Sequence, residues 1–201
     1  MNTILTQEDL IAAVNEYGIL PFWSETGFSA SANAGISFMK LWYMRERAVN
    51  GKQIAYGKFI NKKATFVSLD VLPYLCALRR DGYDYDSLID EGRLPKREAD
   101  IMNAVGDDTV PSYKLGKKLE IKGYDTAVTS LQNKTFLCVT FVKSAMGTAM
   151  LSMPETLFGY DFVRSAYSLT PEQNIEELLK RAPGLQELDE NIRRKALTPA
   201  V

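Results

Sequence analysis

The chain has 201 residues, of which 46% are hydrophobic and 24% are charged, a composition that predicts a folded globular protein. No run approaches the roughly 18 apolar residues of a membrane span, and no basic stretch followed by an apolar one opens the chain, so we expect a cytoplasmic protein that does not enter a membrane. A net charge of −1 argues against indiscriminate binding to nucleic acid, and the absence of histidine excludes Ser-His and Cys-His catalysis and imidazole metal sites.

The first part of the chain predicts two helices. Thr6 and Asp9 have the spacing of an approximate capping box, and the apolar residues that follow mark an amphipathic helix that Gly18 can end. Residues 24–36 are rich in Ser, Gly and Ala and predict a loop. A second helix is expected to begin near Phe38, where apolar residues recur at helical spacing.

A β-hairpin and a further helix are predicted next. The patterns at 54–60 and 64–69, separated by a short polar turn, favour two paired strands. Asp70 is the expected N-cap of a helix that stops at Gly82. Residues 81–94 gather several carboxylates without the spacing of a calcium loop, so we expect turns and helix caps there.

The following region predicts three helices in succession. The first ends at Gly106, and the second covers residues 112–121. The third has Asp125 as its expected N-cap and apolar residues at helical spacing. Three short helices in this order are typical of the helix-turn-helix group of folds.

A two-stranded wing is expected to follow the third helix. The pattern alternates from Phe136 onward, and a second strand is predicted at residues 148–153 after a loop at 143–147. Helices followed by such a wing are the order of a winged helix-turn-helix, in which the third helix normally lies in the major groove of DNA.

These patterns predict an α+β fold made of winged helix-turn-helix elements, small antiparallel hairpins and C-terminal helices. We expect an N-terminal helical region with a β-hairpin at 1–94, a winged-helix unit at 95–153 and a helical extension at 154–201, packed as one compact body. The hairpin within 54–69, with the helices before it, suggests a second, degenerate winged-helix unit.

The charges are distributed unevenly along the chain. Residues 81–108 carry nine acidic and three basic side chains, whereas residues 111–143 carry six lysines and two acids. Such a local basic surface is typical of a site-directed binder of nucleic acid. The lysines expected to meet phosphates, unless they form an ordinary solvated face, are Lys114, Lys117, Lys118, Lys122, Lys134 and Lys143.

The third predicted helix carries polar side chains on its expected outward face. Hydroxyl and amide groups can hydrogen-bond phosphates or base edges, and the residues expected to approach the groove are Thr126, Thr129, Ser130 and Asn133. A second candidate set for phosphate contact and base stacking consists of Tyr56, Lys58, Arg79, Arg80 and Tyr83. A structural role is the alternative for this set, because cations stabilise the C-terminus of a helix and a tyrosine can pack against it.

Cys76 and Cys138 both lie within apolar patterns far apart in the sequence. Buried free thiols explain them better than a disulfide or a thiolate metal site. We therefore expect no metal and no cofactor.

Three segments together resemble a known family. They are "YGKFINKKATFVSLDVLPYLCALRRDGYDYD", "GYDTAVTSLQNKTFLCV" and "ETLFGYDFVRSAY". This pattern is similar to the short bacterial proteins classed as AlkZ-related, which belong with the winged-helix DNA glycosylases also called YcaQ-like. The resemblance implies winged-helix elements that form a basic concave surface for duplex DNA.

The resemblance also implies a candidate catalytic position. In the full-length enzymes a Gln-x-Gln or Gln-x-Asp pair positions a water that cleaves the bond between a damaged base and its sugar. The nearest counterpart here is Gln132-Asn133-Lys134, with lysine in the second polar place. Gln132 is therefore the candidate catalytic residue, although a lysine at 134 suits phosphate binding equally well.

Three hypotheses remain open from the sequence. The leading one is a DNA-binding winged-helix protein related to these glycosylases that recognises damaged or distorted duplex. The second adds base excision, with Gln132 positioning water and Tyr56 or Tyr83 filling the gap left by an extruded base. The third is a winged-helix module that binds a protein partner and no DNA.

Overall fold

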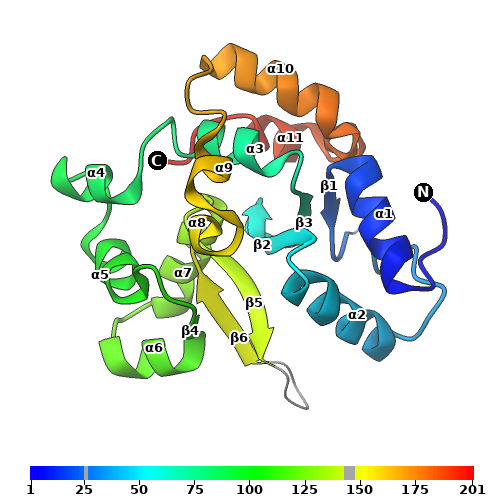
Figure 1. Cartoon of the computed structure of the whole chain (residues 1–201), viewed down its shortest axis with the longest axis horizontal. Coiled ribbons are helices and arrows are strands. Elements are labelled where there is room, and N and C mark those ends of the chain that lie inside the picture. Colours follow the sequence, from blue (N-terminus) through cyan, green and yellow to red (C-terminus); the bar gives the residue numbers. More distant parts are fainter. Residues whose placement is uncertain (25–26, 143–147) are drawn as a thin grey trace.

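The computed structural model describes residues 1–24, 27–142 and 148–201, in which helices surround two small antiparallel sheets (Figure 1). The helices are α1 (Gln7–Tyr17), α2 (Phe38–Asn50), α3 (Leu72–Arg79), α4 (Tyr85–Asp90), α5 (Lys96–Val105), α6 (Ser112–Leu119), α7 (Tyr124–Asn133), α8 (Pro154–Phe158), α9 (Tyr160–Arg164), α10 (Pro171–Arg181), the 3-10 helix η1 (Pro183–Glu187) and α11 (Glu190–Ala196). The strands are β1 (Ile19–Pro21), β2 (Ile54–Ile60), β3 (Lys63–Ser68), β4 (Val110–Pro111), β5 (Cys138–Val142) and β6 (Thr148–Ser152). This arrangement confirms the predicted α+β class.

The central unit, residues 96–152, contains α5, β4, α6, α7, β5 and β6 in chain order. Strand β6 lies between β4 and β5, and Val110 and Val139 both pair with Leu151. The order of helices and strands matches that of a winged helix-turn-helix, with α7 as the third helix. The predicted wing loop, residues 143–147, lies outside the described residues.

The N-terminal unit, residues 7–68, has a similar plan with α1, β1, α2, β2 and β3. Its last strand also lies in the middle of its sheet, because Ile19 and Ala55 both pair with Val67. Turns occupy the described residues 27–36, the place where the central unit has α6. The order of elements in the described part of this unit thus resembles that of the central unit, and its interpretation as a degenerate winged helix stays a prediction.

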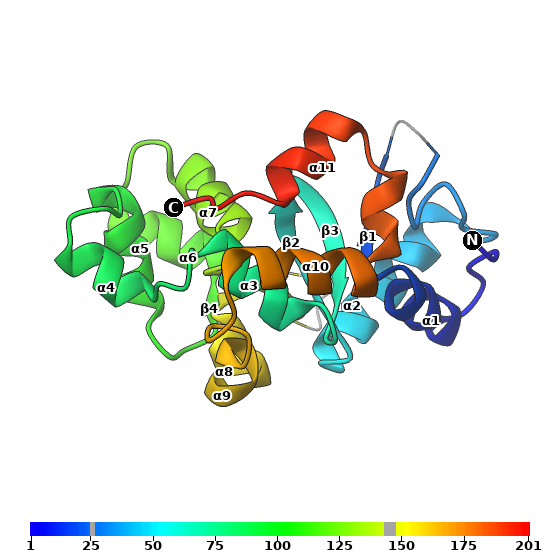
Figure 2. The ribbon, with the colours of Figure 1, turned by 90° about the horizontal axis from the view of Figure 1, so that it is seen from above.

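A common core joins the two units. Ile19 and Val67 of the N-terminal unit share one buried cluster with Leu75 of α3, Cys138 of β5 and Leu178 of α10. Figures 1 and 2 show α10 lying beside α3. The two units thus fold against the same apolar residues, and the predicted division at residues 94 and 153 stays a prediction.

Several local predictions need correction. Each sheet gains a short third strand, β1 or β4, that the sequence patterns did not indicate. Val71 and not Asp70 precedes α3, and the Asp70 carboxylate instead binds Arg181 at 2.7 Å. Helix α7 begins after Gly123, which has a φ of +77°, so Asp125 lies in the first turn rather than at the N-cap. Glycine adopts this left-handed backbone without strain, and an acid in the first turn still suits the helix dipole.

The acidic stretch at residues 81–94 contains a helix, where the sequence predicted turns and helix caps. Helix α4 covers Tyr85–Asp90, and Leu88 on it is fully buried. Asp84 precedes the helix, but its side chain makes no capping hydrogen bond. It forms an ion pair with Arg164 at 2.8 Å, which links α4 to α9.

Candidate nucleic-acid interface

Helix α6 presents lysines to solvent because its apolar residues face the core of the central unit. Leu115 is buried, whereas the side chains of Lys114, Lys117 and Lys118 are exposed. Lys122, which follows the helix, is exposed as well. Across the described residues, none of these four lysines belongs to an ion pair.

A shallow hollow of about 440 Å³ lies between α6, the start of α7 and β6. Lys117, Tyr113 and Thr148 line it together with Asp125. The aromatic ring of Tyr113 is about half exposed here, so a stacking surface stands beside a cation. This mixture of cation, hydroxyl and ring suits contact with a sugar-phosphate chain.

Helix α7 has one free end and one covered end. Thr126 near its start is exposed, whereas Thr129, Ser130 and Asn133 are half-buried. Strand β2 of the N-terminal unit causes this burial, because it packs along the C-terminal half of the helix. Of the residues expected in a groove, Thr126 is therefore the one that faces solvent freely.

Gln132 is held by β2. It is buried, and its Oε1 accepts a hydrogen bond of 2.8 Å from the backbone N–H of Lys58. Strand β2 lies at the edge of its sheet, so Gln132 satisfies a donor that has no neighbouring strand. This contact engages one lone pair of the Gln132 amide oxygen, and a catalytic role for Gln132 stays a prediction.

Lys58 links the hairpin to α7. Its exposed side chain donates from Nζ to Thr129 Oγ1 at 3.1 Å. The structure therefore brings this member of the second candidate set beside the first set. Arg79 also contacts the first set, because its Nε donates to the carbonyl of Asn133 at 3.1 Å.

Tyr56 and Tyr83 have structural partners. Tyr56 is buried, its hydroxyl accepts a hydrogen bond of 3.2 Å from Arg45 Nη1, and burial raises its pKa. Tyr83 is half-buried, with the Arg93 guanidinium carbon 4.4 Å from its ring centroid. Both rings thus contact an arginine of this chain, and their interpretation as base contacts stays a prediction.

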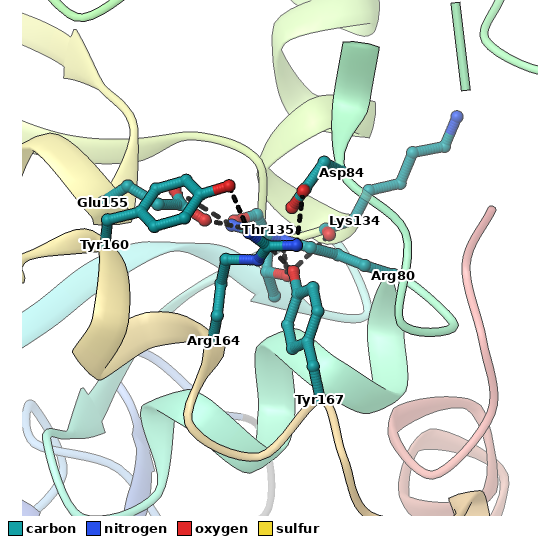
Figure 3. Close-up of polar contacts among 8 residues, drawn as sticks. All are labelled: Arg80, Asp84, Lys134, Thr135, Glu155, Tyr160, Arg164 and Tyr167. Atoms are coloured by element: carbon teal, nitrogen blue, oxygen red, sulfur yellow. Dashed lines mark hydrogen bonds and ion pairs between the residues drawn. The ribbon is translucent and has the colours of Figure 1, made fainter. Parts of the chain in front are cut away.

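Arg80 lies at the centre of a buried polar cluster that Figure 3 shows. Its guanidinium binds both carboxylate oxygens of Glu155 and donates from Nη1 to the hydroxyl of Tyr167 at 2.9 Å and from Nη2 to the carbonyl of Thr135 at 2.7 Å. Burial alone would lower the pKa of Arg80, but its interactions with Cys76, Glu155 and Tyr167 raise it above the ordinary value. Arg80 is therefore a charged link between α3, α8, the segment that follows α9 and the turn after α7.

Two further predicted phosphate contacts point into the protein. Lys134 Nζ binds the buried carboxylate of Glu98 at 2.7 Å, and only 12% of the Lys134 side chain is exposed. Arg79 is also buried and donates to backbone carbonyls. Lys134, Arg79 and Arg80 therefore all have partners within the protein, and their role as phosphate contacts stays a prediction. Lys143 lies outside the described residues.

Metal-binding and membrane-spanning features are absent from the part of the chain that the structure describes. There, no group of three or more His, Cys, Asp or Glu side chains is placed to hold a metal ion. Within the same residues, no helix combines the length and apolar character needed to cross a bilayer.

The model of the family described as AlkZ related matches residues 4–197. This chain belongs to the AlkZ-related family. The AlkZ-related chain is also similar in structure to the Streptomyces sahachiroi DNA glycosylase AlkZ, with a TM-score of 0.53 and 10% sequence identity. That similarity covers 96% of this chain and 59% of the Streptomyces protein, so this AlkZ-related chain spans well under two thirds of its length. Among curated proteins, no sequence matches it.

Proposed function

We propose that this chain binds duplex DNA through the central unit and recognises damaged or distorted duplex. The observation that carries the proposal is the group of exposed lysines on α6 and at residue 122, which have no carboxylate partner in the described structure. Membership of the AlkZ-related family and the structural similarity to a DNA glycosylase support the same ligand.

Binding of this kind rests mainly on phosphate contacts. Lys117, Lys118 and Lys122 would each neutralise a phosphate and release counterions, which makes affinity fall steeply with salt. Thr126 at the free end of α7 is placed to approach a groove edge, and Lys58 would extend the positive surface along the helix. Distorted duplex is favoured as a ligand because the covered half of α7 leaves little of it to enter a regular major groove.

Base excision is not part of this proposal. The amide oxygen of Gln132 already accepts from the backbone N–H of Lys58, so less of this side chain is available to hold a water against a base. Breaking the hydrogen bond between Lys58 and Gln132 would leave a backbone N–H without its acceptor. Lys134, two positions further along the chain, is held in an ion pair with the buried Glu98. Both contacts favour a structural role for this segment. We therefore propose binding and not cleavage.

The test is fluorescence anisotropy with a short duplex, intact or carrying an abasic-site analogue, at low and physiological salt. The double variant Lys117→Glu/Lys118→Glu should weaken binding at least about tenfold and reduce the salt slope by about 2. Lys40→Glu/Lys52→Glu makes the same charge change at exposed lysines of the N-terminal unit and serves as the matched control.

Tighter binding to the abasic duplex would support damage recognition. Equal loss of affinity in both double variants would indicate an effect of net charge alone and contradict the assigned surface. An absence of duplex binding even at low salt would contradict the proposal and favour the protein-partner hypothesis.

A further inference from the structure

A second basic cleft lies at the far end of α7 from the lysines of α6. It has a volume of about 430 Å³ and separates the β2–β3 turn from the C-terminal segment, residues 195–200. Lys62, Arg79 and Lys195 supply its positive charge, and Asn61 and Asn133 supply amide groups. Its lining contains no carboxylate among the described residues.

Arg79 gives this cleft a buried charge that nothing in the described structure neutralises. Its Nε donates to the carbonyl of Asn133 at 3.1 Å, and its Nη1 donates to the carbonyls of Lys195 and Thr198. The Asn133 amide makes hydrogen bonds through both its oxygen and its nitrogen. The oxygen accepts from Arg79 Nη2 at 2.7 Å, and the nitrogen donates to the carbonyl of Phe59. All of these acceptors are neutral.

The next residue along the chain shows how unusual this is. Arg80 is equally buried but binds the carboxylate of Glu155, as a buried guanidinium normally does. Burial lowers the pKa of Arg79 to about 10, so it stays charged at neutral pH without an acidic partner. A bound anion would neutralise this charge.

The turn between β2 and β3 fixes the backbone position of Lys62. Asn61 and Lys62 have φ values of +49° and +59°, as in a two-residue type I′ hairpin turn, and Ile60 pairs with Lys63 across it. Lys62 is therefore mounted on a tight turn rather than on a long loop. Lys195 lies on α11, which packs against β2 (Figure 2), and it lines the cleft together with Lys62.

We propose that this cleft binds a phosphate group. Arg79 supplies the buried charge, and Lys62 and Lys195 approach the phosphate oxygens from the two walls. Helix α7 connects the cleft to the lysines of the α6 surface, and its ten residues span roughly 15 Å. That length corresponds to about four base pairs of duplex.

Phosphate binding by the cleft does not depend on the function proposed above. The inference that this phosphate belongs to a DNA backbone rests on that proposed function. Two probes separate these points. Inorganic phosphate, added at constant ionic strength against chloride, reports on the cleft through the thermal midpoint of unfolding. A labelled duplex, titrated by anisotropy, reports on DNA.

The test variant is Lys62→Gln/Lys195→Gln, because both side chains are exposed and their removal leaves the buried Arg79 in place. Phosphate should raise the midpoint of the wild type and not that of this variant. The duplex salt slope of the variant should fall by about 1, as expected for the loss of one phosphate contact. Lys40→Gln/Lys52→Gln is the charge-matched control and should behave as the wild type in both assays.

The outcomes are distinct. A phosphate effect that the variant loses, together with a smaller duplex slope, supports a DNA phosphate in the cleft. The same phosphate effect with unchanged duplex binding by the variant supports a site for free phosphate compounds. The same phosphate effect without any duplex binding by the wild type also supports such a site, and it contradicts only the proposed DNA function. An equal response of wild type and variant to phosphate, with an unchanged duplex slope, overturns the cleft as a phosphate site.

Discussion

Helix α2 of the N-terminal unit and helix α7 of the central unit both precede a pair of hairpin strands, yet their surroundings differ. Around α2 the exposed side chains include the aromatic Phe38 and the apolar Met39 beside two cations, Lys40 and Arg47. Around the start of α7 the surface carries lysines and hydroxyl groups. The same order of elements therefore does not fix the ligand, which depends on the exposed side chains.

The two units also differ in what their edge strands do. Strand β2 of the N-terminal unit is covered by α7, which places Gln132 on a backbone donor of that strand. This contact covers the exposed edge of β2, but it also buries the C-terminal half of α7, the helix that a winged helix would otherwise present to DNA. In our proposal the N-terminal unit therefore supports α7, and the central unit carries the binding surface.

The largest expected effect concerns Arg80, which ties α3 to the turn after α7. Arg80→Met should lower the free energy of unfolding by about 3–5 kcal/mol, because it leaves the carboxylate of Glu155 buried without a partner. Urea unfolding measures the change. Lys96→Met, which removes a pair with Asp100 in which the lysine side chain is 88% exposed, should cost less than about 1 kcal/mol. Equal costs for the two changes would contradict the central role of Arg80.

The thiols of the common core predict a dependence on alkaline pH. Burial raises the pKa of Cys76 to about 11 and that of Cys138 well above its ordinary value. The folded protein then holds these protons at a pH where the unfolded chain releases them, so stability is complete below about pH 9 and falls as pH rises. Between pH 8 and 10 the loss should be roughly 1.4 kcal/mol for each thiol.

Urea unfolding of the wild type and of Cys76→Ala/Cys138→Ala at these two pH values checks this prediction. The double variant should lose most of the pH dependence, whatever its stability at pH 8. An identical decline in both proteins would assign the effect to other groups, such as the tyrosines whose pKa values burial also raises.

Gln132 tests the junction between the units. Gln132→Ala should cost about 1–3 kcal/mol in unfolding free energy, because the N–H of Lys58 loses its acceptor. Ser130→Ala, on the same helix, should cost less than about 0.5 kcal/mol. If the wild type releases an alkylated base, a Gln132→Ala protein that keeps full stability but loses this release would support the catalytic interpretation.

The smallest effect is expected on the aromatic surface of the N-terminal unit. Met39→Ser removes an exposed apolar side chain, and it should change duplex affinity less than about twofold because the residue carries no charge to neutralise a phosphate. Anisotropy under the conditions used for the lysine variants provides the measurement. A large loss of affinity would move the DNA surface to α2.

Local signals predicted much of the fold. The capping box predicted at Thr6–Asp9 forms, because it involves residues only three positions apart, and the structure has a second one at Thr170–Gln173 with the same spacing. The hairpin of β2 and β3 follows equally from a local turn. Strands β1 and β4 were missed because two or three residues show no period, and a partner strand far along the chain defines them.

The candidate site was predictable only where side chains stay in solvent. The lysines of α6 are exposed as their helical spacing from Leu115 indicates. Arg80 and Gln132 could not be placed in this way, since their partners Glu155 and Lys58 are 75 and 74 positions away. Sequence spacing shows which residues share a helix face, but not which distant element covers that face.

Hydrogen–deuterium exchange with and without a short abasic duplex tests most directly whether the central unit binds DNA. The account predicts slower exchange on DNA binding at residues 112–126, with no change in α2. Protection confined to α2, or protection nowhere at a duplex concentration that saturates the anisotropy signal, would contradict it.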